Sequence, residues 1–189
     1  CSRSDSKMPR KAFHPSPASS TDPSTWSSFE TAINAVNEGR YDYIGFVFHD
    51  NGIVGVDIDD GYDDEGFLSP LAADIIGKCK SYTEKSKSGT GFHILIKGDL
   101  PFTGKNNLKG VEIYKTARYF IMTGDTLLYD AIIDNQEAID YIVEKYFPEV
   151  RESENKGFTP KIYTPIWDKP TMDGRIRLRP IYNPIPDGT

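Results

Sequence analysis

The apolar residues in the first part of the chain recur at helical spacing. They lie between a stretch rich in Ser and Thr and Gly39, and they are Trp26, Phe29, Ile33 and Val36. Apolar residues three or four positions apart share one face of a helix, while Ser or Thr favours its start and glycine its end. The pattern predicts an amphipathic helix that begins near Trp26 and ends before Gly39, with Trp26 anchored in the core.

Two apolar runs after this helix have the character of β-strands. They are IGFVF at 44–48 and IVGVDID at 53–59, with HDNG between them. An Asn-Gly pair favours a tight reversal because both residues tolerate positive φ. The two runs are therefore predicted to form a β-hairpin around Asn51-Gly52. Further strands are predicted at 82–85, 92–97, 111–114 and 118–124.

Two more helices complete the predicted regular structure. Ser69-Pro70 is typical of a helix start, and Ile75 and Cys79 then share one apolar face. A last helix is predicted near 135–147, where apolar residues again recur at helical spacing. The order helix, hairpin, helix and strands predicts an α+β fold, with a mixed sheet and flanking helices.

The two ends of the chain differ in composition from its middle. Residues 1–24 are rich in Ser and Pro and are interpreted as an irregular arm, whereas residues 25–147 hold the predicted elements and form the expected folded domain. Residues 148–189 are interpreted as a proline-rich extension with one short strand near 176–179. Three arginines would share one face of that strand, where they either contact a nucleic-acid backbone or protect a solvated strand edge: Arg175, Arg177 and Arg179.

Composition and charge narrow the class of protein. The chain of 189 residues is 38% hydrophobic, so a folded core is expected, and its apolar runs are shorter than the ~18–20 residues of a membrane span. Its two cysteines suit neither a disulfide framework nor a zinc site, so a cytoplasmic location is expected. The net charge of −6 is unusual for a nucleic-acid-binding protein, but six carboxylates lie within DIDDGYDDE (57–65), where divalent cations would offset them.

The strand that ends in GVDID carries the first candidate chemistry. Alternate residues of a strand share a face, so Asp57 and Asp59 lie together, opposite Val56 and Ile58. At about 6 Å and an effective dielectric near 20, the two carboxylates repel each other by roughly 3 kcal/mol, which favours a hard divalent cation between them. A solvated acidic strand end would show the same residues. An EF-hand calcium loop fits less well, because its Gly and Glu positions do not match.

The loop SKSGTG (86–91) and the strand after it offer a second candidate site. Small residues allow backbone N–H groups to approach a phosphate, and His93 could donate to a phosphate oxygen. The loop residues assigned to this role are Ser88, Gly89 and Gly91. An ordinary hairpin turn would use the same residue types, and the loop lacks the G-K-[ST] sequence of a P-loop.

Two charged residues in the next strands complete the set. Glu112 is polar within the apolar run VEIY, so it could be a third metal ligand, although an exposed strand position would also explain it. Arg118 opens the following strand and could grip a triphosphate in a bidentate way. The alternative for Arg118 is a surface ion pair of little energetic value.

The order DIDD, SGTGFH and EIY…RYFIMTG resembles the primase–polymerase domains of the archaeo-eukaryotic primase superfamily. The resemblance covers residues 7–125 and is strongest to replication proteins of phages, plasmids and other mobile elements. It implies an RRM-like sheet with a two-metal site for Mg²⁺ or Mn²⁺. The implied metal ligands and catalytic residues are Asp57, Asp59 and Glu112, and the implied nucleotide contacts are Ser88, Gly89, Gly91, His93 and Arg118. One departure is Gly91, where the superfamily often has Ser; Ser88 is the implied substitute.

The resemblance implies template-directed nucleotidyl transfer, by a DNA primase and DNA polymerase that acts in replication. The implied partners are a DNA template and primer, nucleoside triphosphates, and a helicase in the same or another chain. One alternative is a metal-dependent nuclease, but Glu112 and Lys115 are three residues apart and so lie on opposite strand faces. The other is a non-catalytic replication initiator or adaptor with a primase fold, which the intact acidic trio disfavours.

Overall fold

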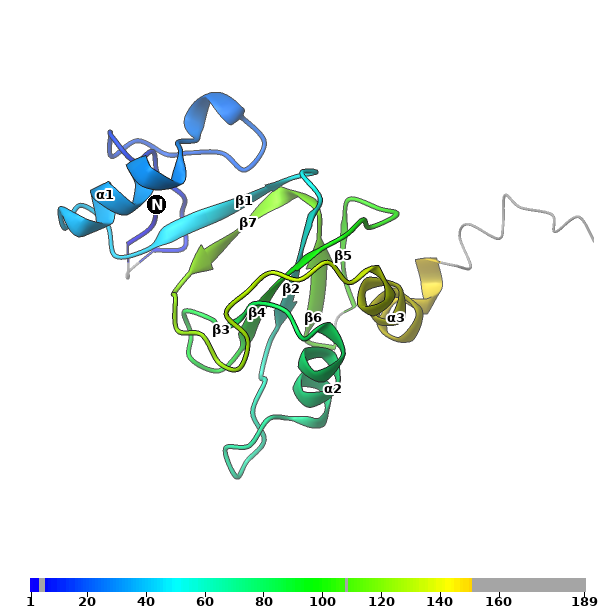
Figure 1. The fold of residues 1–189 in the computed structure, drawn as a ribbon. Helices are drawn as coiled ribbons and strands as arrows, with labels where there is room; N and C mark the ends of the chain where they lie inside the picture. Colours follow the sequence, from blue (N-terminus) through cyan, green and yellow to red (C-terminus); the bar gives the residue numbers. More distant parts are fainter. Residues whose placement is uncertain (4–5, 108, 151–189) are drawn as a thin grey trace, which may run out of the picture. The chain divides into compact units, whose positions relative to one another are not determined.

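The computed structural model describes residues 1–3, 6–107 and 109–150, and residues 1–148 form one compact unit. The helices are η1 (Pro23–Thr25), α1 (Phe29–Asn37), α2 (Pro70–Cys79) and α3 (Gln136–Tyr146). The strands are β1 (Ile44–His49), β2 (Ile53–Ile58), β3 (Thr83–Lys85), β4 (Phe92–Lys97), β5 (Gly104–Asn106), β6 (Val111–Tyr114) and β7 (Thr116–Met122) (Figure 1). The strands predicted between residues 44 and 124 and the last two helices are confirmed, whereas β5 and η1 were not predicted; the strand predicted near 176–179 lies outside the described residues. The stripe of Arg175, Arg177 and Arg179 lies outside the described residues.

The strands form two sheets, and the predicted mixed sheet is wrong. One sheet has five strands in the order β3-β4-β2-β6-β5, and the other consists of β1 and β7. Every ladder between the strands of the described residues is antiparallel. The helix α2 leads from β2 to β3, a connection that often makes two strands parallel neighbours. Here β4 lies between β2 and β3, so each neighbouring pair stays antiparallel and the fold is α+β with antiparallel sheets.

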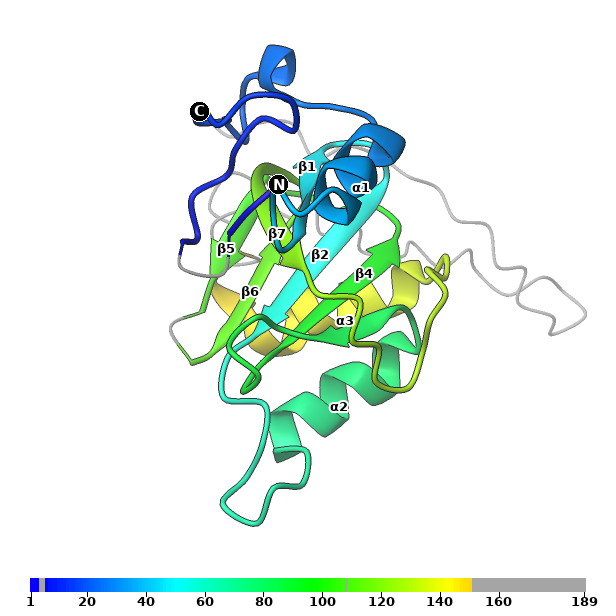
Figure 2. The same cartoon turned by 90° about the vertical axis from the view of Figure 1, so that its left-hand side faces the viewer.

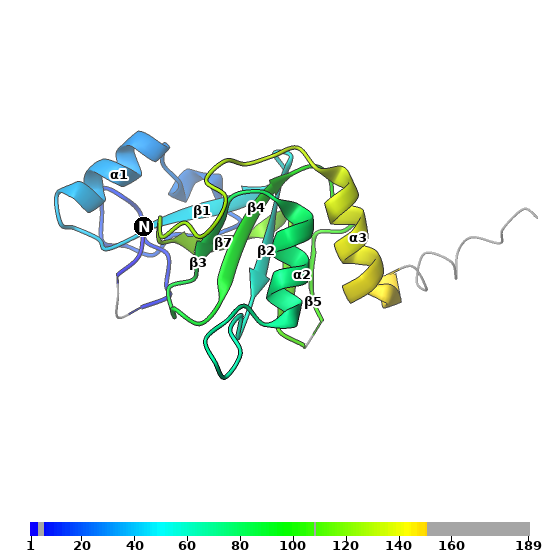
Figure 3. The same cartoon turned by 60° about the horizontal axis from the view of Figure 1, so that its bottom comes forward.

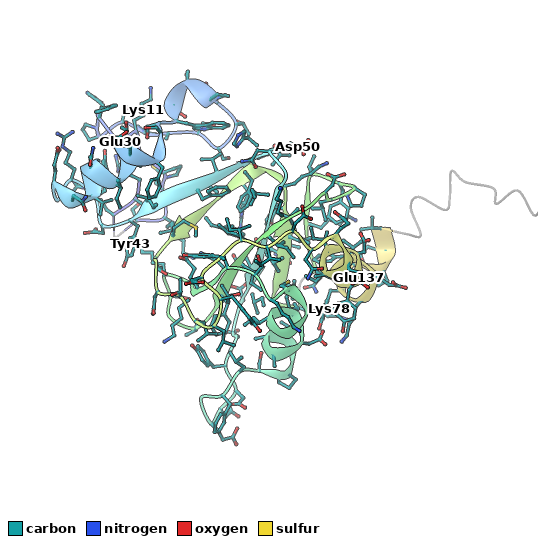
Figure 4. All side chains as sticks on the ribbon, viewed as in Figure 1. Lys11, Glu30, Tyr43, Asp50, Lys78 and Glu137 are labelled. Carbon is teal, nitrogen blue, oxygen red and sulfur yellow. The ribbon has the colours of Figure 1, made fainter. Side chains whose placement is uncertain are left out.

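The predicted hairpin between β1 and β2 is also wrong, because the two strands belong to different sheets. β1 pairs with β7 and β2 pairs with β6, and only Lys115 separates β6 from β7. The type I′ turn that an Asn-Gly pair favours needs positive φ at both residues, but here Gly52 has positive φ and Asn51 does not. The chain turns a corner at Asp50 instead (Figure 4). The Asp50 N–H donates there to the Lys115 carbonyl at 2.8 Å.

One face of the five-stranded sheet is the hydrophobic core. Fully buried side chains alternate along its central strands: Val54, Val56, Ile58, Phe92, Ile94, Ile96, Val111 and Ile113. Helices α2 and α3 cover this face side by side (Figures 1 and 3) and contribute Ile75 and Cys79, as predicted, and Ile139. Asp74 of α2 joins them by accepting hydrogen bonds from the Tyr141 and Tyr146 hydroxyls. The opposite face carries a second buried apolar cluster, formed by Phe48, Leu95 and Phe120, and polar side chains lie beside it.

The first helix begins later than predicted. Ser28 caps α1 by accepting a hydrogen bond from the Thr31 N–H, so Trp26 lies before the helix. Trp26 is half-buried and its Nε1 donates to the Ser19 carbonyl at 2.6 Å, while Phe29 is 69% exposed. Helix α1 lies beside β1 and β7 (Figure 2). No helix of the described residues is long and apolar enough to cross a membrane.

Candidate active site

A row of polar side chains crosses the five-stranded sheet at one level. Asp57 of β2 pairs with His93 of β4 on one side and with Glu112 of β6 on the other. The row continues to the sheet edges, because Glu84 of β3 pairs with His93 and Asn106 of β5 pairs with Glu112. Alternation along each strand puts this row on the face away from α2 and α3. Three of the residues singled out in the sequence are thus neighbours in space.

The His93 ring occupies a closed environment in the middle of this row. Its Nδ1 lies 3.3 Å from Glu84 Oε1, and its Nε2 lies 3.7 Å from Asp57 Oδ1. One face of the ring stacks on Phe120, with ring centroids 4.5 Å apart and an angle of 15° between the planes. Only 7% of His93 is exposed. The imidazole therefore has a fixed position between two carboxylates.

Asp57 is electrostatically crowded. Burial raises the pKa of its carboxyl group, and although His93 and Arg118 oppose this effect, Asp59 and Glu112 add to it by repulsion. A raised pKa means that the folded protein disfavours the carboxylate form. A positive ion near Asp57 would reverse that preference, and carboxylate oxygens are the donors that Mg²⁺ and Mn²⁺ favour.

Glu112 and Arg118 are partners of each other. Glu112 Oε2 accepts from Arg118 Nη2 at 2.6 Å and from the Tyr114 hydroxyl at 3.0 Å, while Oε1 accepts from Asn106 Nδ2 at 2.7 Å. The Arg118 guanidinium also lies over the Tyr114 ring, 4.8 Å from its centroid. Both carboxylate oxygens of Glu112, the candidate third metal ligand, therefore already accept hydrogen bonds from its own sheet and from β7.

The carboxylates of Asp57, Asp59 and Glu112 are suitable ligands for a divalent cation, but their side chains are not arranged around one ion position. Among the described residues, no three His, Cys, Asp or Glu side chains are arranged so that they could hold one metal ion. Asp57 and Asp59 do line the same pocket, and Glu112 would have to release Arg118 to join them. Asp57 and Asp59 are thus the two carboxylates best placed to receive a metal.

The pocket beside this row has a volume of about 350 Å³ and carries charges of both signs. Acidic residues line it beside basic residues, the loop serines and His93; its charged and polar lining is Asp57, Asp59, Lys7, Lys87, Arg118, Ser86, Ser88, Ser20 and His93. Such a lining suits a ligand that combines anionic groups with divalent cations, as a metal-bound triphosphate does. A larger pocket of about 620 Å³ lies between α1 and the β1–β7 sheet, and its apolar lining includes none of the predicted site residues.

The loop 86–91 is a hairpin connection that turns its serines towards the pocket. It joins β3 to β4, which pair directly. Two of its amides are used within the loop, since Ser86 N–H donates to the Gly91 carbonyl and Gly89 N–H to the Ser86 carbonyl. The Ser86 and Ser88 hydroxyls, 2.9 Å apart, line the pocket instead. Gly89 and Gly91 therefore shape the loop, and Ser88 is the predicted loop residue that reaches the pocket.

The absence of Ser at position 91 has a steric cause. A Cβ atom at Gly91 would lie 2.3 Å from the Ile58 carbonyl oxygen, and that oxygen belongs to the strand backbone. Gly91→Ala is therefore expected to destabilise the fold by about 3 kcal/mol, since the backbone must shift. The measurement is the free energy of unfolding in urea. Gly77→Ala on α2 is the matched control: it has free space and is expected to be neutral or to stabilise by up to about 1 kcal/mol.

Three charged residues in or behind the pocket were not predicted from the sequence. Glu84 could have been found, because a hairpin closed by the loop 86–91 puts position 84 opposite His93. Lys87 lies within the loop that was singled out, although only its small residues were assigned a role. Lys7 comes from the N-terminal arm, and its position depends on tertiary packing that no local pattern indicates.

Comparison with known proteins found similarity to a phage protein. The chain is 28% identical over 176 residues to a protein of Nitratiruptor phage NrS-1 named DNA Primase-polymerase. The similarity covers 89% of this chain but 24% of the phage protein, so the chain spans about a quarter of that relative's length. No family model matches the chain. The similarity thus supports a primase–polymerase relationship at a distant level.

Proposed function

We propose that this chain is the catalytic part of a DNA primase–polymerase, which transfers nucleotides to a growing strand under the direction of a DNA template. The observation that carries the proposal is the pocket in which Asp57 and Asp59 face basic residues and His93. The similarity to the phage primase–polymerase supports the same function. The proposed setting is the replication of a phage, plasmid or other mobile element.

Asp57 and Asp59, with Glu112 as the third ligand, would hold two Mg²⁺ or Mn²⁺ ions. Such ions supply an activated 3′-hydroxyl and neutralise charge on the triphosphate and leaving pyrophosphate. Asp57 suits this role because burial and repulsion from Asp59 and Glu112 raise the pKa of its carboxyl group. The free energy spent on holding those carboxylates together would be recovered when cations bind.

The remaining residues of the pocket would bind and orient the triphosphate. His93 presents the Nε2 edge of its ring on the side of Asp57, from which it could donate to a phosphate oxygen when the ring carries a proton on both nitrogens. The ammonium group of Lys7 and the hydroxyls of Ser86 and Ser88 offer further donors. Lys87 also lines the pocket, but its Nζ already donates to the Arg3 and Ser6 carbonyls. His93, Lys7 and the two serines would stabilise negative charge that develops on the phosphates in the transition state. Pairing with the template base would select the incoming nucleotide.

A nuclease remains less well supported. The strand lysine that such a site would use is Lys115, but its Nζ donates to Asp99 at 3.0 Å and lies 3.5 Å from Asp50. Lys115 does not line the pocket of Asp57 and Asp59. Extension of a primer annealed to a DNA template separates the three functions, because a polymerase lengthens the primer, a nuclease shortens nucleic acid, and a binding module leaves it unchanged.

Arg118→Ala is expected to weaken the binding of a nucleoside triphosphate about 10- to 100-fold, because a charge-assisted contact to phosphate is lost. Arg118→Lys should restore part of the affinity, since it keeps the charge without the bidentate geometry. The measurement is calorimetric titration with dATP and Mg²⁺. Arg40→Ala is the control, because Arg40 pairs with Glu38 on the surface and does not line the pocket. Equal affinities of the Arg118→Ala variant and the wild type would leave Arg118 as a partner of Glu112 alone.

A further inference from the structure

Glu84 is a fully buried carboxylate that points at His93 and not at solvent. Its exposed fraction is 0%, and it does not line the charged pocket. Glu84 Oε1 accepts from the Thr123 N–H at 3.0 Å, and Oε2 accepts from the Gly124 N–H at 2.9 Å and the Tyr82 hydroxyl at 2.7 Å. The fourth contact is His93 Nδ1, 3.3 Å from Oε1. A carboxylate with this many donors is held in a single orientation.

The ionisation state of Glu84 decides whether His93 Nδ1 donates or accepts the hydrogen bond between the two side chains. Burial opposes the charged form, but the hydrogen bonds from His93, Tyr82 and the two backbone N–H groups outweigh burial and lower the pKa of Glu84. Glu84 is therefore ionised near neutral pH and can only accept hydrogen bonds. It follows that Nδ1 of His93 carries a proton and donates it to Glu84.

The contacts of His93 with Phe120 and Glu84 leave the Nε2 edge of its ring as the edge that faces the pocket. Phe120 covers one face of the imidazole, and Glu84 holds the Nδ1 edge. The remaining nitrogen, Nε2, lies on the side of Asp57, and both residues line the charged pocket. A hydrogen bond at one ring nitrogen sets the tautomer and the direction of the other, as it does for histidines that bind metals.

We propose that Glu84 is a positioning residue, which holds the His93 ring so that Nε2 faces the pocket and stays available to a ligand there. The role of that ligand as a triphosphate rests on the proposed function, but the orientation of His93 does not. Glu84 also ties this orientation to the end of β7, because the Thr123 and Gly124 N–H groups bind the same carboxylate. Nucleotide affinity is thereby coupled to the packing of the segment after β7.

The test is ¹⁵N NMR of the imidazole at a pH where the ring is neutral, without metal or nucleotide. Signals of His93 are assigned by their loss in His93→Gln, because His14 and His49 remain. The wild type is expected to carry its ring proton on Nδ1, and Glu84→Gln to shift the population towards the Nε2–H form. Tyr82→Phe is the matched control, since it removes another donor to Glu84 without touching His93, and it should keep the proton on Nδ1.

Binding of dATP with Mg²⁺, measured by calorimetry, provides the second readout. Glu84→Gln is expected to weaken binding about tenfold, because it removes the anionic partner of a His93 ring that carries both protons when Nε2 donates to a phosphate. The double variant Glu84→Gln/His93→Gln should bind no more weakly than His93→Gln alone, because both changes act on the same contact. A wild-type His93 with its proton on Nε2 alone would overturn the proposal, even if Glu84→Gln fails to fold. The Nδ1–H form in a wild type that binds no nucleotide would keep the positioning role and refute the proposed function.

Discussion

Asp57→Asn is expected to lower the rate of nucleotide incorporation about 1,000-fold, which corresponds to about 4 kcal/mol of transition-state stabilisation from the lost metal ligand. The same change is expected to raise the melting temperature in the presence of EDTA. Burial, then repulsion from Asp59 and Glu112, raises the pKa of Asp57 in the folded chain, so its charge opposes folding at neutral pH. That penalty disappears in the wild type as the pH falls through the folded-state pKa, and the amide removes it at every pH.

Two measurements check this pair of effects, a gel-resolved rate of primer extension and a thermal melt. Asp134→Asn is the control, because Asp134 is exposed and pairs only with Lys97 at 3.7 Å among the ion pairs of the described residues. It should leave both the rate and the melting temperature close to those of the wild type. A slow Asp57→Asn variant that also melts well below the wild type would indicate a structural role for Asp57.

Gly55→Ala is expected to destabilise the fold by about 3 kcal/mol, a fall in melting temperature of roughly 10 °C for a chain of this size. A Cβ atom at Gly55 would lie 2.2 Å from the Phe48 ring and 2.7 Å from the Phe120 ring. The two rings cover the sheet face beside the polar row and pack edge to face, with their centroids 4.7 Å apart. Because Phe120 also stacks on His93, its displacement should weaken nucleotide binding as well.

A second strand glycine supplies the comparison for Gly55. A Cβ atom at Gly45 of β1 would meet a Tyr119 ring carbon at 3.1 Å, and that half-buried side chain has room to move. Gly45→Ala should therefore cost less than half as much free energy of unfolding in urea as Gly55→Ala. Equal losses in the two variants would mean that the contact of Phe48 and Phe120 over Gly55 does not control stability.

Local patterns in the sequence predicted the elements whose ends are chemically marked. Ser69 caps α2 and Asn135 caps α3 through hydrogen bonds to backbone N–H groups, and both helices lie where periodicity predicts them. The prediction of a hairpin between β1 and β2 was wrong, because a residue type that favours positive φ, such as Gly52, indicates a bend but not which strands pair. β1 pairs with β7, and β2 pairs with β4 and β6; these partners lie roughly 35 to 80 residues away in the chain, and such pairing leaves no local trace.

The candidate site was predictable to the extent that it follows from strand alternation and motif order. Asp57 and His93 are neighbours because antiparallel pairing puts them opposite each other, and Glu112 lies across from Asp57 for the same reason. The ion pair between Glu112 and Arg118 was not predictable, because it depends on how β7 leaves the sheet after Lys115. The contribution of Lys7 depends likewise on the packing of the N-terminal arm.

The most direct test of the proposed function is extension of a labelled primer on a DNA template, with the purified 189-residue chain, Mg²⁺ or Mn²⁺, and one dNTP at a time. The expected result is a primer lengthened by the nucleotide complementary to the next template base, and no extension by the Asp57→Asn/Asp59→Asn double variant. A primer that stays unchanged in both metals, one that is shortened, or one that the double variant extends at the wild-type rate would contradict template-directed nucleotidyl transfer at these carboxylates.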